Sequence, residues 1–153
     1  MLSEKNIIYG FCKATHPPKN KYLISLHRSP ELDIIACFTT SKNRTGRTYV
    51  EKEHGKIKDG KDNIVSYFFK HGVTIGKNLN GDDFTFPEDT TIVFDYCFQT
   101  GEQNAILNNF KDPKVKCVLS DDEYYNLIYA MYKSPHTPKE FIPIFEDKLN
   151  KMK

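Results

Sequence analysis

Short apolar runs, many of them with alternating polar positions, extend along the chain as far as Leu119 and predict β-strands. Gly10 lies inside the first run, which favours a bulge or bend there. Turn residues 28–31 separate the second and third runs and predict an antiparallel hairpin. Prolines in residues 14–20 predict a loop before that hairpin. The predicted strands cover residues 6–13, 21–27, 32–40, 64–69, 72–76, 90–98 and 114–119.

The periodicity changes after Ser120. Ser120 and Glu123 have the spacing of a capping box, in which the Ser hydroxyl accepts a hydrogen bond from the Glu123 amide and the Glu123 carboxylate reaches back. Apolar residues then recur at spacings of three and four, which predicts a helix of about thirteen residues. Thr137 and Pro138 predict a second helix start, and Pro143 is expected to break or restart that helix.

A series of strands followed by helices favours a mainly β (α+β) fold, because few segments could form a βαβ crossover. We expect a small antiparallel barrel with one or two C-terminal helices. The length of 153 residues suits a single domain, residues 1–153. Within it we place the barrel at 5–119, a charged loop at 41–62 and the helical segment at 120–151.

Composition and charge narrow the classes of function. The net charge of +2 is too small for histone-like binding, so a nucleic-acid contact needs a local patch. No run approaches the ~20 apolar residues of a membrane span, and we find no secretory signal, so we expect a cytoplasmic protein that makes no membrane contact.

The four cysteines form no C-x-x-C pair and have no His at zinc-ligand spacing. We therefore expect buried free thiols, no metal and no cofactor.

Hydroxyl and basic residues follow the third predicted strand. Thr40 and Ser41 offer hydroxyls, and Lys42, Arg44 and Arg47 offer cations within the charged loop. Hydroxyls can bind phosphate oxygens, and cations can stabilise charge that develops on a phosphate. This pattern predicts a phosphate site, although a Thr-rich strand end with solvated charges is the open alternative.

Two residues are candidates for proton transfer. His16 lies in the proline-containing loop with Lys19 and Lys21 close behind it, and such loops often carry binding groups. Asp95 interrupts an otherwise apolar strand, where an unpaired buried carboxylate would cost on the order of several kcal/mol. A solvated loop histidine and a structural pairing of Asp95 with Lys or Arg remain the alternatives.

The order of these segments resembles the MazF/PemK-like (Kid/CcdB-type) toxin family. The resemblance is carried by KYLISL, DIIACFTTSK, TTIVFDYCF and VLSDDEYYNLIYAMYKS. Lys21 matches a basic residue that precedes an aliphatic run, where the family usually has Arg, and Thr40 with Ser41 matches a Thr-Ser pair. The helix start at residues 119–123 also matches. Val93 stands where the family commonly has an Arg.

The resemblance implies an SH3-like barrel that cleaves RNA and is neutralised by an antitoxin, often as a homodimer. We therefore predict a metal-independent endoribonuclease that cleaves single-stranded RNA through the 2′-hydroxyl. The alternative is a catalytically inactive SH3-like barrel that binds protein or RNA. The candidate catalytic residues are His16, Lys21, Thr40 and Asp95, and the candidate RNA-binding residues are Lys19, Ser41, Lys42, Arg44 and Arg47.

Overall fold

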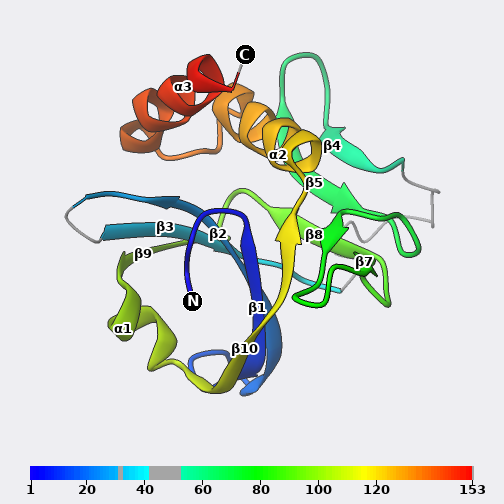
Figure 1. Cartoon of the computed structure of the whole chain (residues 1–153). Coiled ribbons are helices and arrows are strands. Elements are labelled where there is room, and N and C mark those ends of the chain that lie inside the picture. Colours follow the sequence, from blue (N-terminus) through cyan, green and yellow to red (C-terminus); the bar gives the residue numbers. More distant parts are fainter. Residues whose placement is uncertain (31–32, 42–52, 153) are drawn as a thin grey trace.

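The protein consists of two antiparallel β-sheets and a set of helices (Figure 1). The structure is a computed structural model that describes residues 1–30, 33–41 and 53–152. The larger sheet has the strand order β7-β6-β10-β1-β2-β3-β9. Its strands are β1 (Asn6–Cys12), β2 (Lys19–Arg28), β3 (Asp33–Phe38), β6 (Gly76–Lys77), β7 (Asp83–Phe84), β9 (Phe98–Glu102) and β10 (Phe110–Leu119).

The smaller sheet has the order β4-β5-β8, and the helices follow the later strands. The remaining elements are β4 (Gly55–Lys58), β5 (Ile64–Phe69), β8 (Thr90–Val93), α1 (Gln103–Leu107), α2 (Asp121–Lys133), the 3₁₀ helix η1 (Lys139–Phe141) and α3 (Ile142–Lys151). The mainly β prediction with C-terminal helices is confirmed. The SH3-like barrel stays a prediction, because the described strands form two sheets and not one closed ladder.

The predicted hairpin is confirmed as β2 and β3, which pair antiparallel from Leu23 opposite Phe38 to Arg28 opposite Ile34. The bulge expected near Gly10 is also present, since the β1–β10 register shifts between Tyr9 and Phe11. At Gly10 a Cβ atom would lie 3.0 Å from the Pro113 Cα and 3.1 Å from the Lys111 carbonyl oxygen. A residue without a side chain therefore suits this close approach of β1 and β10.

The prediction of one strand over residues 90–98 is wrong. β8 ends at Val93, a turn follows, and β9 begins at Phe98 in the other sheet. The turn exposes Asp95, while the Phe94 amide donates a 3.1 Å hydrogen bond to the Val65 carbonyl. The turn allows Phe94 and Cys97 both to be buried while the two residues between them are exposed, which strict alternation along one strand would not permit.

The helical predictions are confirmed in part. The Glu123 amide donates to the Ser120 hydroxyl at 3.2 Å, as a capping box requires. The reciprocal bond is absent, because the Glu123 carboxylate instead accepts from the Tyr67 hydroxyl and contacts His54. Pro143 lies in the first turn of α3, after η1, so the helix restarts there as expected.

Four further points concern the elements and their boundaries. The short helix α1 was not predicted. The edge strand expected at 72–76 is reduced to the two residues of β6, and β2 begins at Lys19, inside the expected loop. The expected loop 41–62 contains β4, and residues 42–52 lie outside the described residues.

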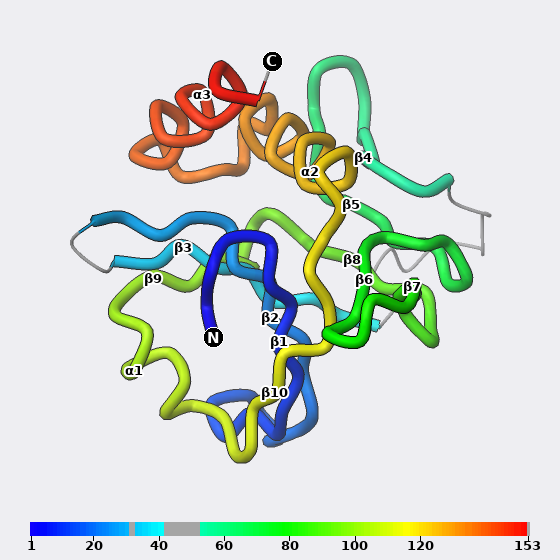
Figure 2. Tube along the Cα trace, in the orientation of Figure 1, coloured from blue at the N-terminus to red at the C-terminus, as the bar shows by residue number. Residues whose placement is uncertain are grey.

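The core lies on both faces of the larger sheet. Figure 2 shows α2 and α3 on one side of that sheet and α1 on the other. Tyr124 and Phe145 belong to the cluster under α2 and α3, and Ile106 belongs to the cluster under α1. All four cysteines are buried free thiols, as predicted. Of the described helices, none has the length and apolar character needed to cross a membrane.

Candidate functional site

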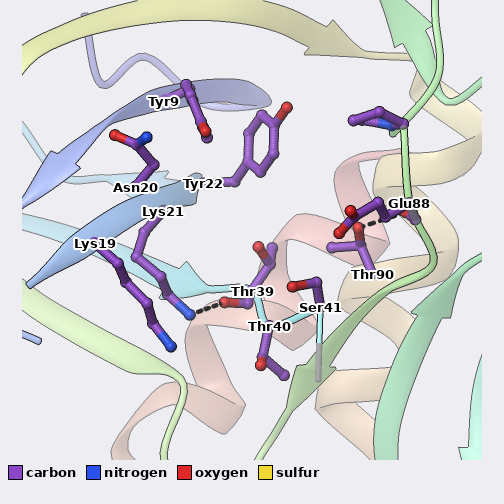
Figure 3. Close-up of a pocket in the computed structure, with 11 residues that line it drawn as sticks. Tyr9, Lys19, Asn20, Lys21, Tyr22, Thr39, Thr40, Ser41, Glu88 and Thr90 are labelled. Carbon is purple, nitrogen blue, oxygen red and sulfur yellow. Dashed lines mark hydrogen bonds between the residues drawn. The ribbon is translucent and has the colours of Figure 1, made fainter. Parts of the chain in front are cut away.

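A cavity of about 250 Å³ opens where β1, the start of β2 and the end of β3 face the loop before β8 (Figure 3). We call it the tyrosine cavity. It is lined by Tyr9, Lys19, Asn20, Lys21, Tyr22, Thr39, Thr40, Ser41, Pro87, Glu88 and Thr90. Cationic, hydroxyl, aromatic and carboxylate side chains therefore line one space.

A second cavity of about 250 Å³ adjoins the first, and we call it the histidine cavity. It is lined by Ala14, Thr15, His16, Lys19, Lys21, Phe38, Thr39, Thr40, Val93 and Tyr96. Four of these residues also line the tyrosine cavity: Lys19, Lys21, Thr39 and Thr40. We call these four residues the shared set.

Strand geometry brings the shared set together. Lys19 and Lys21 are two residues apart on β2, so their side chains lie on one face of the sheet. The Lys21 ammonium donates to the Thr39 carbonyl and lies 5.9 Å from the centre of the Phe38 ring. Figure 3 shows both lysine side chains extending towards Thr39 and Thr40. The site thus holds two cations beside two hydroxyls, a combination that suits a phosphate group.

Two tyrosines on neighbouring strands form the aromatic wall of the tyrosine cavity. Tyr9 and Tyr22 are directly paired across β1 and β2, and their ring centres are 4.4 Å apart. Tyr22 also packs edge-on against buried Phe86 at 4.9 Å, which fixes its ring from the core side. Burial, with the nearby Tyr9 and Glu88, raises the pKa of Tyr22, so its phenol stays protonated at neutral pH.

Glu88 enters the tyrosine cavity from the loop before β8, across from the two lysines (Figure 3). The Thr90 hydroxyl donates to the Glu88 carbonyl at 2.9 Å. Next to it, Asp89 accepts a 3.0 Å hydrogen bond from the His71 amide, and the His71 Nδ1 lies 2.6 Å from the same carboxylate oxygen. The backbone bond and then the imidazole lower the pKa of Asp89. These contacts hold the loop that carries Glu88.

The structure brings together most of the described candidates. Lys19, Lys21, Thr40 and Ser41 line the tyrosine cavity, and His16 lines the adjoining histidine cavity. Candidates Lys42, Arg44 and Arg47 lie outside the described residues.

Asp95 is placed differently from the other described candidates. It lines neither cavity and instead lies on the exposed turn between β8 and β9. There its carboxylate is 2.8 Å from the Nδ1 of His136, whose Nε2 lies 2.8 Å from the Asn63 side-chain oxygen. Asp95 thus has a structural partner, although the partner is a histidine and not the Lys or Arg that we considered.

Sequence reasoning missed the aromatic and acidic walls of the tyrosine cavity. Tyr9 and Tyr22 stand in apolar strands, where aromatic residues ordinarily pack into a core. Their pairing depends on the register of β1 against β2, which the local pattern does not reveal. Glu88 follows a proline in a turn and carries no motif. The only sequence signal for this cavity is the group of hydroxyl and basic residues around Thr40.

No metal centre is evident in the described part of the chain, where no three His, Cys, Asp or Glu side chains gather in a way that could hold an ion. The chain matches no protein-family model, no curated protein and no solved structure.

Proposed function

We propose that the protein is a toxin-like, metal-independent endoribonuclease, built on an SH3-like barrel, that holds single-stranded RNA across its two cavities. One observation supports this above all: Lys19, Lys21, Thr39 and Thr40 line both cavities, and His16 lines one of them. The resemblance of the chain to MazF/PemK-like toxins points in the same direction.

The shared set is suited to binding a phosphodiester. Two ammonium groups can offset the charge that builds on the phosphate oxygens in the transition state. The hydroxyls of Thr40 and Ser41 can donate to the same oxygens. Hydrogen bonds from charged donors are about twice as strong as neutral ones, so Lys19 and Lys21 would supply most of the phosphate affinity.

The proposed reaction uses the RNA as its own nucleophile. His16 accepts the proton of a 2′-hydroxyl, and the 2′ oxygen bonds to the adjacent phosphorus. The bond from phosphorus to the 5′ oxygen breaks, and that oxygen takes a proton from water. The hydroxide that remains takes the proton from the His16 imidazolium, which restores the neutral imidazole. The products are a 2′,3′-cyclic phosphate and a 5′-hydroxyl. Imidazole suits the proton-transfer step, because it can both accept and donate a proton.

The test is cleavage of single-stranded RNA by the full chain in excess EDTA, with detection of the 2′,3′-cyclic phosphate. Single changes His16→Ala, Lys21→Ala and Thr40→Ala should each reduce the rate at least about tenfold. Lys139→Ala on η1 and Thr100→Ala on β9, both exposed, serve as matched controls. Wild-type rates in all three site variants would refute this assignment.

The alternative is a catalytically inactive SH3-like barrel that binds RNA or protein. Val93 favours it, because this residue lines the histidine cavity where the family resemblance would place an Arg. Binding of intact RNA without any turnover would support this alternative. Cleavage that is abolished by EDTA would contradict both the metal-independent reaction and the alternative.

The family resemblance also makes an antitoxin and a homodimer part of the proposal. Expression of the full chain should arrest growth, and co-expression of a small acidic protein encoded next to it should restore growth. The His16→Ala variant should express without arrest. Arrest by this variant at wild-type strength would separate toxicity from the proposed RNA cleavage.

A further inference from the structure

The two cavities extend in different directions from the same shared set of cations and hydroxyls. The tyrosine cavity continues to Tyr9 and Tyr22, and the histidine cavity continues to Phe38 and Tyr96. Each cavity therefore has its own aromatic residues. Tyr96 is 52% exposed, at the solvent side of the histidine cavity.

The size of each cavity limits what it can hold. Each measures about 250 Å³, whereas sites for a whole drug-sized ligand are typically about 300–1,000 Å³. One nucleoside is a suitable size for one cavity. Two successive nucleosides would need both cavities, with the phosphate that joins them at the shared set.

We propose that the two cavities bind two successive nucleotides of an RNA strand, one base against Tyr9 and Tyr22 and the next against Tyr96, with the connecting phosphate on Lys19 and Lys21. This inference rests on the proposed function, because it assumes that the site binds single-stranded RNA. Base stacking on aromatic side chains is a common way to bind single strands.

The walls of the two cavities differ in polarity, which gives them different roles. In the tyrosine cavity, Asn20 and Glu88 offer an amide and a carboxylate to the edge of a base. Beyond the shared set, the histidine cavity presents Phe38, Val93 and Tyr96 to a base. Of its two other polar side chains, Thr15 donates its hydroxyl to backbone carbonyls, and His16 is assigned to the 2′-hydroxyl. Hydrogen-bonding groups discriminate between bases, whereas stacking accepts any base. The tyrosine cavity is therefore the selective one.

The experiment uses a dinucleoside monophosphate with 2′-fluorine on its 5′ sugar, so that the 2′ oxygen cannot attack. Its dissociation constant for the full chain is measured by NMR titration, with both bases present or with either base removed. The protein variants are Tyr22→Leu and Tyr96→Leu, with Tyr9→Leu as a second probe should Tyr22→Leu not fold. Tyr129→Leu on α2, where Tyr129 is 37% exposed, is the matched control.

Each cavity variant should weaken binding of the intact dinucleotide about 5- to 150-fold, the range for loss of one stacked base. In Tyr22→Leu, removal of the base that stacks on Tyr22 should weaken binding no further. In Tyr96→Leu, the same should hold for removal of the other base. Changing the base that couples to Tyr22 should alter affinity more than changing the base that couples to Tyr96. The control should behave like the unchanged chain.

Two results would overturn the inference: both tyrosines coupling to the same base, or neither coupling to any base. The proposed function fails separately, if the unchanged chain neither binds nor cleaves longer single-stranded RNA. If longer RNA is bound or cleaved and Tyr22 and Tyr96 show no separate coupling, only the two-nucleotide arrangement is wrong.

Discussion

The backbones of Thr40 and Thr91 exchange two hydrogen bonds. The Thr40 amide donates to the Thr91 carbonyl at 2.7 Å, and the Thr91 amide donates to the Thr40 carbonyl at 2.8 Å. This isolated bridge links the end of β3 to β8, and so links the two sheets beside the site. The bridge holds Thr40, which lines both cavities, beside β8. From β8, Thr90 lines the tyrosine cavity and Val93 lines the histidine cavity.

We expect Thr91→Pro to weaken RNA binding and cleavage by disturbing this bridge. Proline lacks the amide that donates to Thr40, and its ring would press on the Thr40 carbonyl. The free energy of unfolding should fall by about 1–3 kcal/mol. Thr91→Val keeps the amide and should retain both activities. Urea unfolding and RNA affinity measure the two effects, and equal RNA affinity in the proline and valine variants would contradict the role of the bridge.

Lys19→Gln should reduce the salt dependence of RNA binding. Each phosphate contact to a single strand contributes about 0.7 to the slope of log K against log salt concentration. Loss of one lysine contact should therefore flatten the slope by about that amount. Lys139→Gln, an exposed change on η1, should leave the slope unchanged. A Lys19→Gln variant with the original slope would show that this lysine does not contact phosphate.

Tyr67→Phe should destabilise the fold. The Tyr67 hydroxyl donates a 2.8 Å hydrogen bond to one oxygen of Glu123, and both residues are buried. Burial, together with the Glu123 charge, raises the pKa of Tyr67, so the phenol remains a donor. Loss of this donor leaves a buried carboxylate less satisfied, at a cost of about 1–3 kcal/mol in the free energy of unfolding.

The control for this change is Tyr129→Phe, at an exposed tyrosine on α2. Surface changes of this kind usually alter stability by less than about 0.5 kcal/mol. Both variants can be compared by urea unfolding at one pH. Equal stability of Tyr67→Phe and the unchanged chain would mean that the hydroxyl contributes nothing to holding α2 on β5.

His27 should make the protein less stable in mild acid. Burial, and then the Lys148 ammonium, lower the pKa of His27, although Glu4 and Asp147 oppose this shift. Its Nδ1 atom is buried and has no hydrogen-bond partner among the described residues. Below the ordinary imidazole pKa of about 6.5, the unfolded chain therefore binds a proton more readily than the folded one. The contribution of neutral His27 to the free energy of unfolding is complete above that pH. It is lost as the pH falls towards the lowered pKa of His27 in the folded chain.

Urea unfolding between about pH 7.5 and about pH 5 measures this dependence. His27→Gln should remove the His27 part of it, so the difference in stability between variant and unchanged chain should vary with pH in this window. A difference that stays constant across the window would contradict the lowered pKa of His27.

Several elements could be predicted because their signals are local. The β2–β3 hairpin follows from two β-rich runs and the turn residues between them. The start of α2 follows from Ser120, whose hydroxyl accepts from the amide three residues later. Thr40 and Ser41 could be singled out because their hydroxyls follow a strand beside basic residues, and both line the tyrosine cavity. Each of these signals involves residues that are neighbours along the chain.

Other features depend on contacts between distant residues. The split of residues 90–98 into β8 and β9 depends on a change of sheet, which alternation along one strand does not encode. The Glu123 carboxylate has the spacing of a capping box but contacts Tyr67, 56 residues away. The Ser120 amide donates instead to the Ile75 carbonyl at 3.0 Å, so both groups of the expected local bond have distant partners.

The sequence by itself determined the β2–β3 hairpin, the start of α2 and the hydroxyl-rich end of the third predicted strand, because turns, caps and periodicity act over a few residues. Only the tertiary structure decided that Tyr9 faces Tyr22, that Glu88 faces the lysines, and that Asp95 turns away to His136. The physical reason is that these contacts join residues that are distant along the chain. Strand register sets the Tyr9–Tyr22 pair, and the packing of the segments on either side of β8 places Glu88 and Asp95.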